Sequence, residues 1–100
     1  MTKQAKFNEV KENLFPILEK YVPVVDRVHG PHHPEFHEVR AIFETMNEKV
    51  KANGGNHPDL QQEFLRMREV TKNYTVPGDV CETYDAVFQM LEKIDQAYEA

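Results

Sequence analysis

The chain has 100 residues, of which 40% are hydrophobic, and this predicts a single domain over residues 1–100 with one modest core. Its 12 basic and 17 acidic residues give a net charge of -5, and no basic block could neutralise a run of phosphates, so nucleic acid is not an expected partner. No apolar run could span a membrane and the N-terminal residues lack the apolar stretch of a signal peptide, so we expect a cytoplasmic protein.

The first helix is predicted from Phe7 to Val28, because apolar residues recur there every three or four positions. Its predicted buried face consists of Phe7, Val10, Leu14, Ile17, Leu18, Tyr21, Val24, Val25 and Val28. Pro16 and Pro23 lie inside this segment, and each removes a backbone N–H and crowds the carbonyl four residues earlier. We therefore expect a kink or a break near them. Gly30 and Pro31 end the helix.

The second helix is predicted from about residue 34 to 52, with Pro34 at its start and Asn53-Gly54-Gly55 at its end. Its predicted buried face is Phe36, Val39, Ile42, Phe43, Met46 and Val50.

The third helix is predicted to begin with Asn56 or His57 as cap and Pro58 in the first turn, and to end near Asn73. Its predicted buried face is Leu60, Phe64, Met67, Val70 or Thr71, and Tyr74.

The fourth helix follows the Pro77-Gly78 turn, and Asp79 with Glu82 is predicted to form a capping box at its start. Its buried face is predicted to be Val80, Tyr84, Val87, Phe88, Leu91, Ile94 and Tyr98. Amphipathic helices with short connections predict an all-α, antiparallel up-down-up-down four-helix bundle. In that topology the turn between the first two helices and the turn between the last two lie at one pole, and the remaining helix ends lie at the other.

Two segments carry a family resemblance. Val28-His29-Gly30, His33-Pro34-Glu35, Glu38-Val39 and Phe43 resemble a signature of the repair-of-iron-centres (RIC) family, which comprises hemerythrin-like di-iron proteins of iron–sulfur cluster repair. The segment from Arg68 to Pro77, followed by Cys81-Glu82-Thr83-Tyr84, resembles a second signature of that family. The resemblance implies a hemerythrin-like bundle and a role in iron–sulfur cluster repair or a nitrosative or oxidative stress response.

The family's iron ligands match this chain poorly. Of the four histidines that the resemblance requires, the first falls on Asn8, the second on Asn53, the third on His57, and the fourth just beyond Ala100. The bridging glutamates have no counterpart, because the connection between the second and third helices is shortened and the chain ends. All these positions lie at one pole, so the resemblance implies a bundle shortened there, without a di-iron centre and with no cofactor expected. His57 is interpreted first as a helix cap.

A histidine cluster at the other pole allows a different interpretation. His29, His32, His33 and His37 lie close in sequence, and zinc or iron would need three or four of them to converge. The favoured interpretation is a polar turn that bonds the exposed helix ends. The alternative is a metal-binding protein that uses this cluster, or a site between two chains that uses His57.

Cys81 is predicted in the first turn of the fourth helix, where the helix dipole favours the thiolate. Because the two turns share a pole, Cys81 is expected to approach the histidines, as a reactive thiol or as a small buried side chain. Neither a catalytic triad nor a phosphate-binding loop is recognisable, so no enzyme is expected. The predicted function is iron–sulfur cluster repair through a protein partner or a homo-oligomer, and the plainest alternative is a helical interaction module unrelated to iron.

Overall fold

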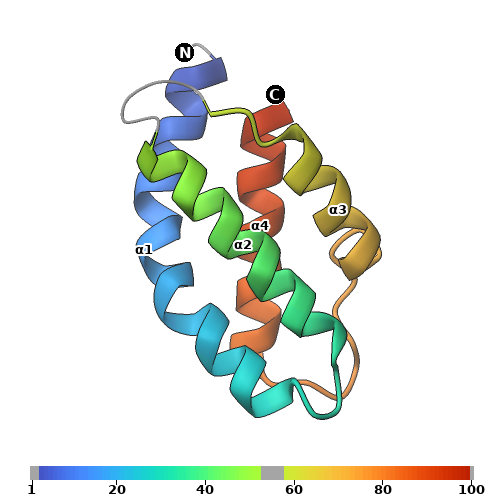
Figure 1. Cartoon of the computed structure of the whole chain (residues 1–100). Coiled ribbons are helices and arrows are strands. Elements are labelled where there is room, and N and C mark those ends of the chain that lie inside the picture. The colour runs from blue at the N-terminus through green and yellow to red at the C-terminus, as the bar shows by residue number, and fades with distance from the viewer. Residues whose placement is uncertain (1–2, 53–57, 100) are drawn as a thin grey trace.

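The computed structural model describes residues 3–52 and 58–99. It contains four helices, α1 (Lys3–His29), α2 (Glu35–Ala52), α3 (Gln61–Thr71) and α4 (Glu82–Glu99). They alternate in direction along an elongated bundle of 39 × 22 × 22 Å (Figure 1). α1 packs against α2 and α4, and α2 packs against α3. The predicted all-α, antiparallel four-helix bundle is confirmed. None of the described helices is both long and apolar enough to cross a membrane.

The core is built around aromatic side chains of α2 and α4. The ring of Tyr84 lies 4.8 Å from that of Phe88 and 5.1 Å from that of Phe36, measured between ring centres. Most of the predicted faces of α2 and α4 are buried, which confirms the helical spacing for these two elements. The fully or nearly buried residues are Phe36, Val39, Ile42, Phe43 and Met46 on α2, and Tyr84, Val87, Phe88, Leu91, Ile94 and Ala97 on α4.

The predicted face of α1 is partly wrong. Phe15 and Val22 are buried in the core, whereas four residues assigned to the core are between 38% and 57% exposed, namely Ile17, Tyr21, Val24 and Val28. Apolar residues cover more than half of the circumference of this helix, so two stripes both satisfy the three-to-four spacing. Which of the two stripes is buried depends on the contacts of α1 with α2 and α4.

We predicted a kink or a break of α1 near its prolines, and a break is wrong, because the helix is continuous from Lys3 to His29. Pro16 is exposed and Pro23 is half-buried. The carbonyls that lose their N–H partner belong to Glu12 and Glu19, which are exposed, so water can hydrate them. The apolar face on the other side holds the helix together by packing.

α3 begins at Gln61, later than predicted, and Pro58 precedes the helix. The Tyr98 side chain fixes this entry, because its hydroxyl accepts a hydrogen bond from the Leu60 N–H (3.0 Å) and lies 3.4 Å from the Pro58 carbonyl oxygen. The Asp59 carboxylate then accepts a hydrogen bond from the Gln61 N–H (3.3 Å). The predicted caps Asn56 and His57, and the predicted stop Asn53-Gly54-Gly55, lie outside the described residues.

α3 ends at Thr71 in a left-handed turn. Lys72, Asn73 and Tyr74 have φ values of 52°, 58° and 62°, a conformation that costs about 1–2 kcal/mol for each non-glycine residue. The Thr71 hydroxyl accepts a hydrogen bond from the Tyr74 N–H (2.9 Å), and the Tyr74 hydroxyl donates to the carboxylate of Asp95 on α4 (2.6 Å). The segment from Arg68 to Pro77 thus contains a strained turn that hydrogen bonds of Thr71 and Asp95 hold in shape.

Candidate functional site

The turn between α1 and α2 and the turn between α3 and α4 meet at one pole of the bundle, as the topology predicts (Figure 1). We call the residues 29–37 and 77–84 at this end the histidine pole. His29 closes α1, and its Nε2 atom lies 3.1 Å from Sγ of Cys81. The thiol is exposed. The predicted approach of Cys81 to the histidines is therefore confirmed, and the pair can exchange a proton.

Cys81 lies just before α4, which begins at Glu82, so its predicted place in the first turn is wrong. Its carbonyl accepts the hydrogen bond of the Asp85 N–H (3.2 Å). The predicted capping box is also wrong, because Asp79 lies further out in the turn and its carboxylate lies 3.0 Å from Nε2 of His33. The interaction between the two turns replaces the local cap.

His33 joins both turns through its two ring nitrogens. Nδ1 lies 3.1 Å from the carboxylate of Glu35 and Nε2 lies 3.0 Å from that of Asp79. A protonated imidazole donates to both carboxylates, whereas a neutral ring donates to only one. His33 thus clamps the start of α2 to the turn that leads into α4.

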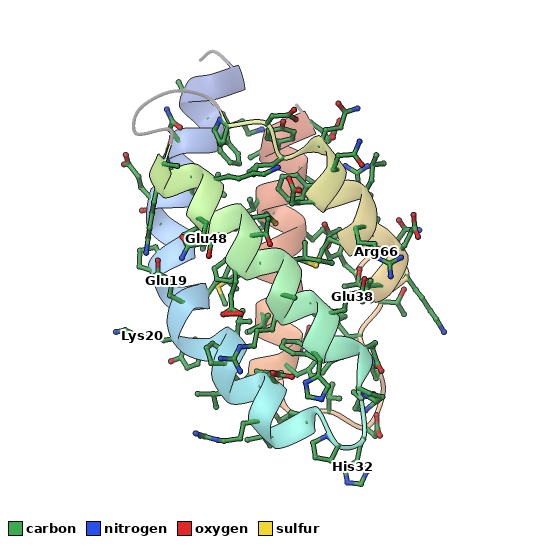
Figure 2. All side chains as sticks on the ribbon, in the orientation of Figure 1. Glu19, Lys20, His32, Glu38, Glu48 and Arg66 are labelled. Carbon is green, nitrogen blue, oxygen red and sulfur yellow. The ribbon has the colours of Figure 1, made fainter. Side chains whose placement is uncertain are left out.

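The remaining two histidines of this pole point to different places. The Nδ1 atom of His37 lies against the carboxylate of Asp26, a buried acid on α1 that also accepts a hydrogen bond from Arg40 (3.2 Å). His32 is exposed at the tip of the turn and points away from the bundle (Figure 2). The ring nitrogens of His29, His33 and His37 therefore have different partners.

This separation bears on the metal interpretation of the cluster. Within residues 3–52 and 58–99, no group of three or more His, Cys, Asp or Glu side chains is arranged so that it could hold a metal ion. His57, the fifth histidine and the candidate for a site between chains, lies outside the described residues. Among the described histidines, His33 joins the two turns by its contact with Asp79, and His29 forms a thiol–imidazole pair with Cys81.

Tyr84 lies beneath the clamp and is fully buried. The rings of His29 and His33 contact its ring with centre-to-centre distances of 5.4 and 5.8 Å. Burial raises the pKa of its phenol to about 12, and the negative charges of Glu35 and Asp79 act in the same direction. No group in the described structure forms a hydrogen bond with its hydroxyl.

The opposite pole is where the resemblance places the iron ligands. Asn8 is half-buried on α1, and its side-chain oxygen accepts a long hydrogen bond from Nζ of Lys11 (3.5 Å). A neutral amide beside an ammonium group is a poor ligand for a metal cation. Asn53 and His57, at two other ligand positions, lie outside the described residues.

Aromatic side chains close the same pole. The Tyr98 ring packs against Phe7 and Phe64 with centre-to-centre distances of 5.4 and 5.1 Å. Phe7 is fully buried and Tyr98 is half-buried, so Tyr98 covers Phe7 at this pole. The Asn8 amide and the aromatic rings of Phe7, Phe64 and Tyr98 are not ligands of the kind that a di-iron centre needs.

Sequence reasoning missed two buried acids that hold the helices together. Asp26 follows Val25 on the buried side of α1, and Asp95 follows Ile94 on the buried side of α4. Asp95 accepts two hydrogen bonds from Arg68, at 2.8 and 2.5 Å. The sequence contains a signal for both, because each aspartate directly follows a core residue, and a buried carboxylate needs a cationic partner.

Comparison with known proteins gives one relationship. The chain is 23% identical, over 124 aligned positions that cover 93% of it, to the iron–sulfur cluster repair protein ScdA of Staphylococcus haemolyticus. The chain is similar to a cluster repair protein. It matches 56% of ScdA, so it spans about half the length of this relative. The alignment is longer than the chain itself and so contains positions with no counterpart here. No family model and no solved structure matches the chain.

Proposed function

We propose that the chain takes part in iron–sulfur cluster repair in the cytoplasm, without a hemerythrin-like di-iron centre of its own, by binding a protein partner and not as an enzyme. Its similarity to ScdA extends over 93% of its length and supports the link to cluster repair. The two segments that resemble the RIC family support the same process.

The observation that carries the proposal is the packing of the pole at which the resemblance places the iron. Phe7, Phe64 and Tyr98 fill it with aromatic carbon, and the Tyr98 hydroxyl binds the backbone at the start of α3. Asn8 replaces an imidazole, and Lys11 adds a positive charge beside it. A cation would have to displace these contacts and would gain weak ligands.

An exposed apolar stripe along α1 supports binding to a partner. Ile17, Tyr21, Val24 and Val28 form an exposed apolar stripe, which leads toward the thiol of Cys81. The groove at the end of this stripe has a volume of about 380 Å³, and it is lined by Tyr21, Val24, Val28, His29 and Cys81 among others. Contiguous exposed apolar surface is typical of an interaction site. In this proposal the stripe and the thiol face the partner together.

Recovery of a damaged cluster enzyme tests the proposal. A [4Fe–4S] hydro-lyase would be inactivated with nitric oxide and incubated with an extract of cells that lack this chain, with or without the purified protein. We expect faster recovery with the protein in the extract, and no recovery with the protein and ferrous iron alone. Unchanged recovery in the extract would contradict the link to repair, and recovery without extract would contradict the need for a partner.

A matched pair of variants tests the surface. Val28 is 57% exposed, so Val28→Glu adds a charge to the stripe with little effect on folding, and it should abolish the acceleration. Gln62→Glu adds the same charge to an exposed position of α3, and it should leave the acceleration intact. Equal activity of both variants would contradict a role for the stripe.

A further inference from the structure

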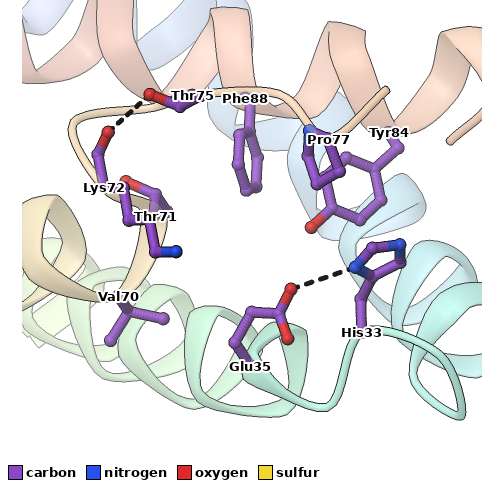
Figure 3. Close-up of a pocket in the computed structure, with 9 residues that line it drawn as sticks. All are labelled: His33, Glu35, Val70, Thr71, Lys72, Thr75, Pro77, Tyr84 and Phe88. Atoms are coloured by element: carbon purple, nitrogen blue, oxygen red, sulfur yellow. Dashed lines mark hydrogen bonds and ion pairs between the residues drawn. The ribbon is translucent and has the colours of Figure 1, made fainter. Parts of the chain in front are cut away.

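A second cavity, separate from the groove beside Cys81, lies between the start of α2, the end of α3 and the first turns of α4. Its volume is about 460 Å³. The apolar part of its wall comes from Val70, Pro77, Phe88 and the ring of Tyr84, and the polar part comes from His33, Glu35, Lys72 and two threonines. Figure 3 shows the Tyr84 hydroxyl and the Glu35 carboxylate directed toward the same space, with Val70 and Thr71 on its far side.

Most polar groups of this wall are already engaged within the chain. The Thr71 hydroxyl donates to the Met67 carbonyl (2.7 Å), and the Thr75 hydroxyl donates to the Lys72 carbonyl (2.7 Å). Among the buried polar groups of the wall the Tyr84 hydroxyl is the exception, because Tyr84 is fully buried and its oxygen has no hydrogen-bond partner among the described residues. A buried hydroxyl without a partner costs about 1–3 kcal/mol. It is therefore the group in this wall that a ligand would satisfy.

The charges around the hydroxyl select the kind of ligand. Glu35 lines the cavity, and Asp79 is joined to it through His33. Burial raises the pKa of the Tyr84 phenol, and both carboxylates add to this shift, so at the phenol they favour a cation, although the exposed Lys72 lines the same cavity. A carbonyl or carboxylate ligand would place more negative charge beside Glu35. An ammonium group would instead donate to the phenol oxygen and to the Glu35 carboxylate.

We propose that the cavity lined by Tyr84, Glu35 and Phe88 is a binding site for a primary ammonium group on a short apolar chain. The ammonium lies between the Tyr84 hydroxyl and the Glu35 carboxylate, and the apolar chain contacts Val70, Pro77 and Phe88. A free alkylamine and the side chain of a lysine in a peptide share this chemistry. The site does not depend on iron, on Cys81 or on the proposed repair function.

Titration by nuclear magnetic resonance with n-butylamine at pH 7 tests the site. We expect saturable shifts of backbone amides of residues 70–75 and 84–88, with a dissociation constant on the order of 1 mM. Butyrate, which reverses the charge, and N-butylacetamide, which removes it, should bind at least about tenfold more weakly. Shifts that do not saturate, or equal binding of butyrate or N-butylacetamide, would overturn the proposal.

Two variants locate the contact. Tyr84→Phe removes only the hydroxyl and keeps the ring contacts with His29 and Phe36, and we expect it to weaken butylammonium binding about tenfold. Glu35→Gln should weaken binding to a similar extent. Tyr21→Phe, on the exposed stripe of α1, is the matched control and should bind normally. Binding to Tyr84→Phe with unchanged affinity, in a protein that unfolds cooperatively, would overturn the proposal.

The source of the ammonium group is decided by a second probe, Nα-acetyl-lysine amide. If it binds as tightly as n-butylamine, the site takes a lysine side chain from a peptide. If it binds at least about tenfold more weakly while n-butylamine saturates, the site takes a free amine. Both results support an ammonium site, and failure of both probes to saturate contradicts it.

Discussion

The Nε2 atom of His29 lies 3.1 Å from Sγ of Cys81, although these residues come from α1 and from the turn before α4. Two segments that are remote in the sequence thus form a thiol–imidazole pair on the surface. The imidazole can accept the thiol proton, and the thiolate is the nucleophilic form of cysteine.

The reactivity of Cys81 should depend on this pair. His29→Ala removes the proton acceptor, and we expect the rate of alkylation by iodoacetamide at pH 7 to fall by about threefold or more. His32→Ala is the control, because His32 is exposed at the tip of the same turn. Equal rates in the native protein and in His29→Ala would show that the imidazole does not activate the thiol.

Gly30 should tolerate no side chain. A Cβ atom at this position would lie 2.3 Å from the Asp26 carbonyl oxygen and 2.7 Å from Cε1 of His37. We expect Gly30→Ala to lower the free energy of unfolding by about 1–3 kcal/mol in a urea titration, because the end of α1 must move. In contrast, a Cβ atom at Gly78 would have no neighbour within 4 Å, so Gly78→Ala should change it by less than about 0.5 kcal/mol. A neutral Gly30→Ala would contradict the close packing of His37 against this turn.

Asp95 should be the strongest single contributor to the contact of α3 with α4. It is 5% exposed and accepts hydrogen bonds from Arg68 and from the Tyr74 hydroxyl. Asp95→Asn removes the buried negative charge beside the Arg68 guanidinium, which keeps the exposed carboxylate of Glu99, and we expect a loss of about 2–3 kcal/mol in the free energy of unfolding. Asp85→Asn loses a contact with the exposed Gln89 and a negative charge in the first turn of α4, and it should lose less than about 1 kcal/mol. Similar losses for the two variants would contradict the assignment.

Stability should fall at alkaline pH in a way that reports Tyr84. Its phenol has a pKa of about 12 in the folded protein, against an ordinary value of 10. Below pH 10 both states keep the proton and the contribution is fully present. Between pH 10 and 12 only the unfolded state loses the proton, so the contribution is lost as the pH rises.

The measurement is urea unfolding at pH 9 and at pH 11. The decrease in unfolding free energy between them should be about 1 kcal/mol larger in the native protein than in Tyr84→Phe. Tyr21→Phe, which changes an exposed tyrosine, should behave as the native protein does. An equal decrease in all three proteins would show that the Tyr84 phenol titrates normally.

Much of the fold follows from the spacing of apolar residues in the sequence. The features that the spacing did not predict, such as the buried face of α1 and the start of α3, have identifiable causes. The faces of α2 and α4 follow from their periodicity, because each carries one apolar stripe. α1 carries two, so the sequence did not show that Val22 is buried while Tyr21 is exposed. The start of α3 depends on Tyr98, a residue of α4, and local capping rules carry no information about such a partner.

The site was predictable in outline and not in detail. The antiparallel topology alone places Cys81 near the histidines, and the structure confirms this. The partners of individual histidines depend on side chains from other elements, such as Asp79 for His33 and Asp26 for His37. Asp79 was assigned to a cap because its spacing to Glu82 fits one, but its interaction with His33 across the two turns took precedence.

The central claim, that this bundle works without a di-iron centre, is tested most directly by its iron content. The purified protein would be loaded anaerobically with ferrous iron, desalted and measured by elemental analysis together with its absorbance spectrum. We predict less than about 0.2 iron per chain, because Asn8 with Lys11 at one ligand position and the aromatic packing around Tyr98 offer no set of imidazoles and carboxylates. Two tightly held irons per chain would contradict the claim.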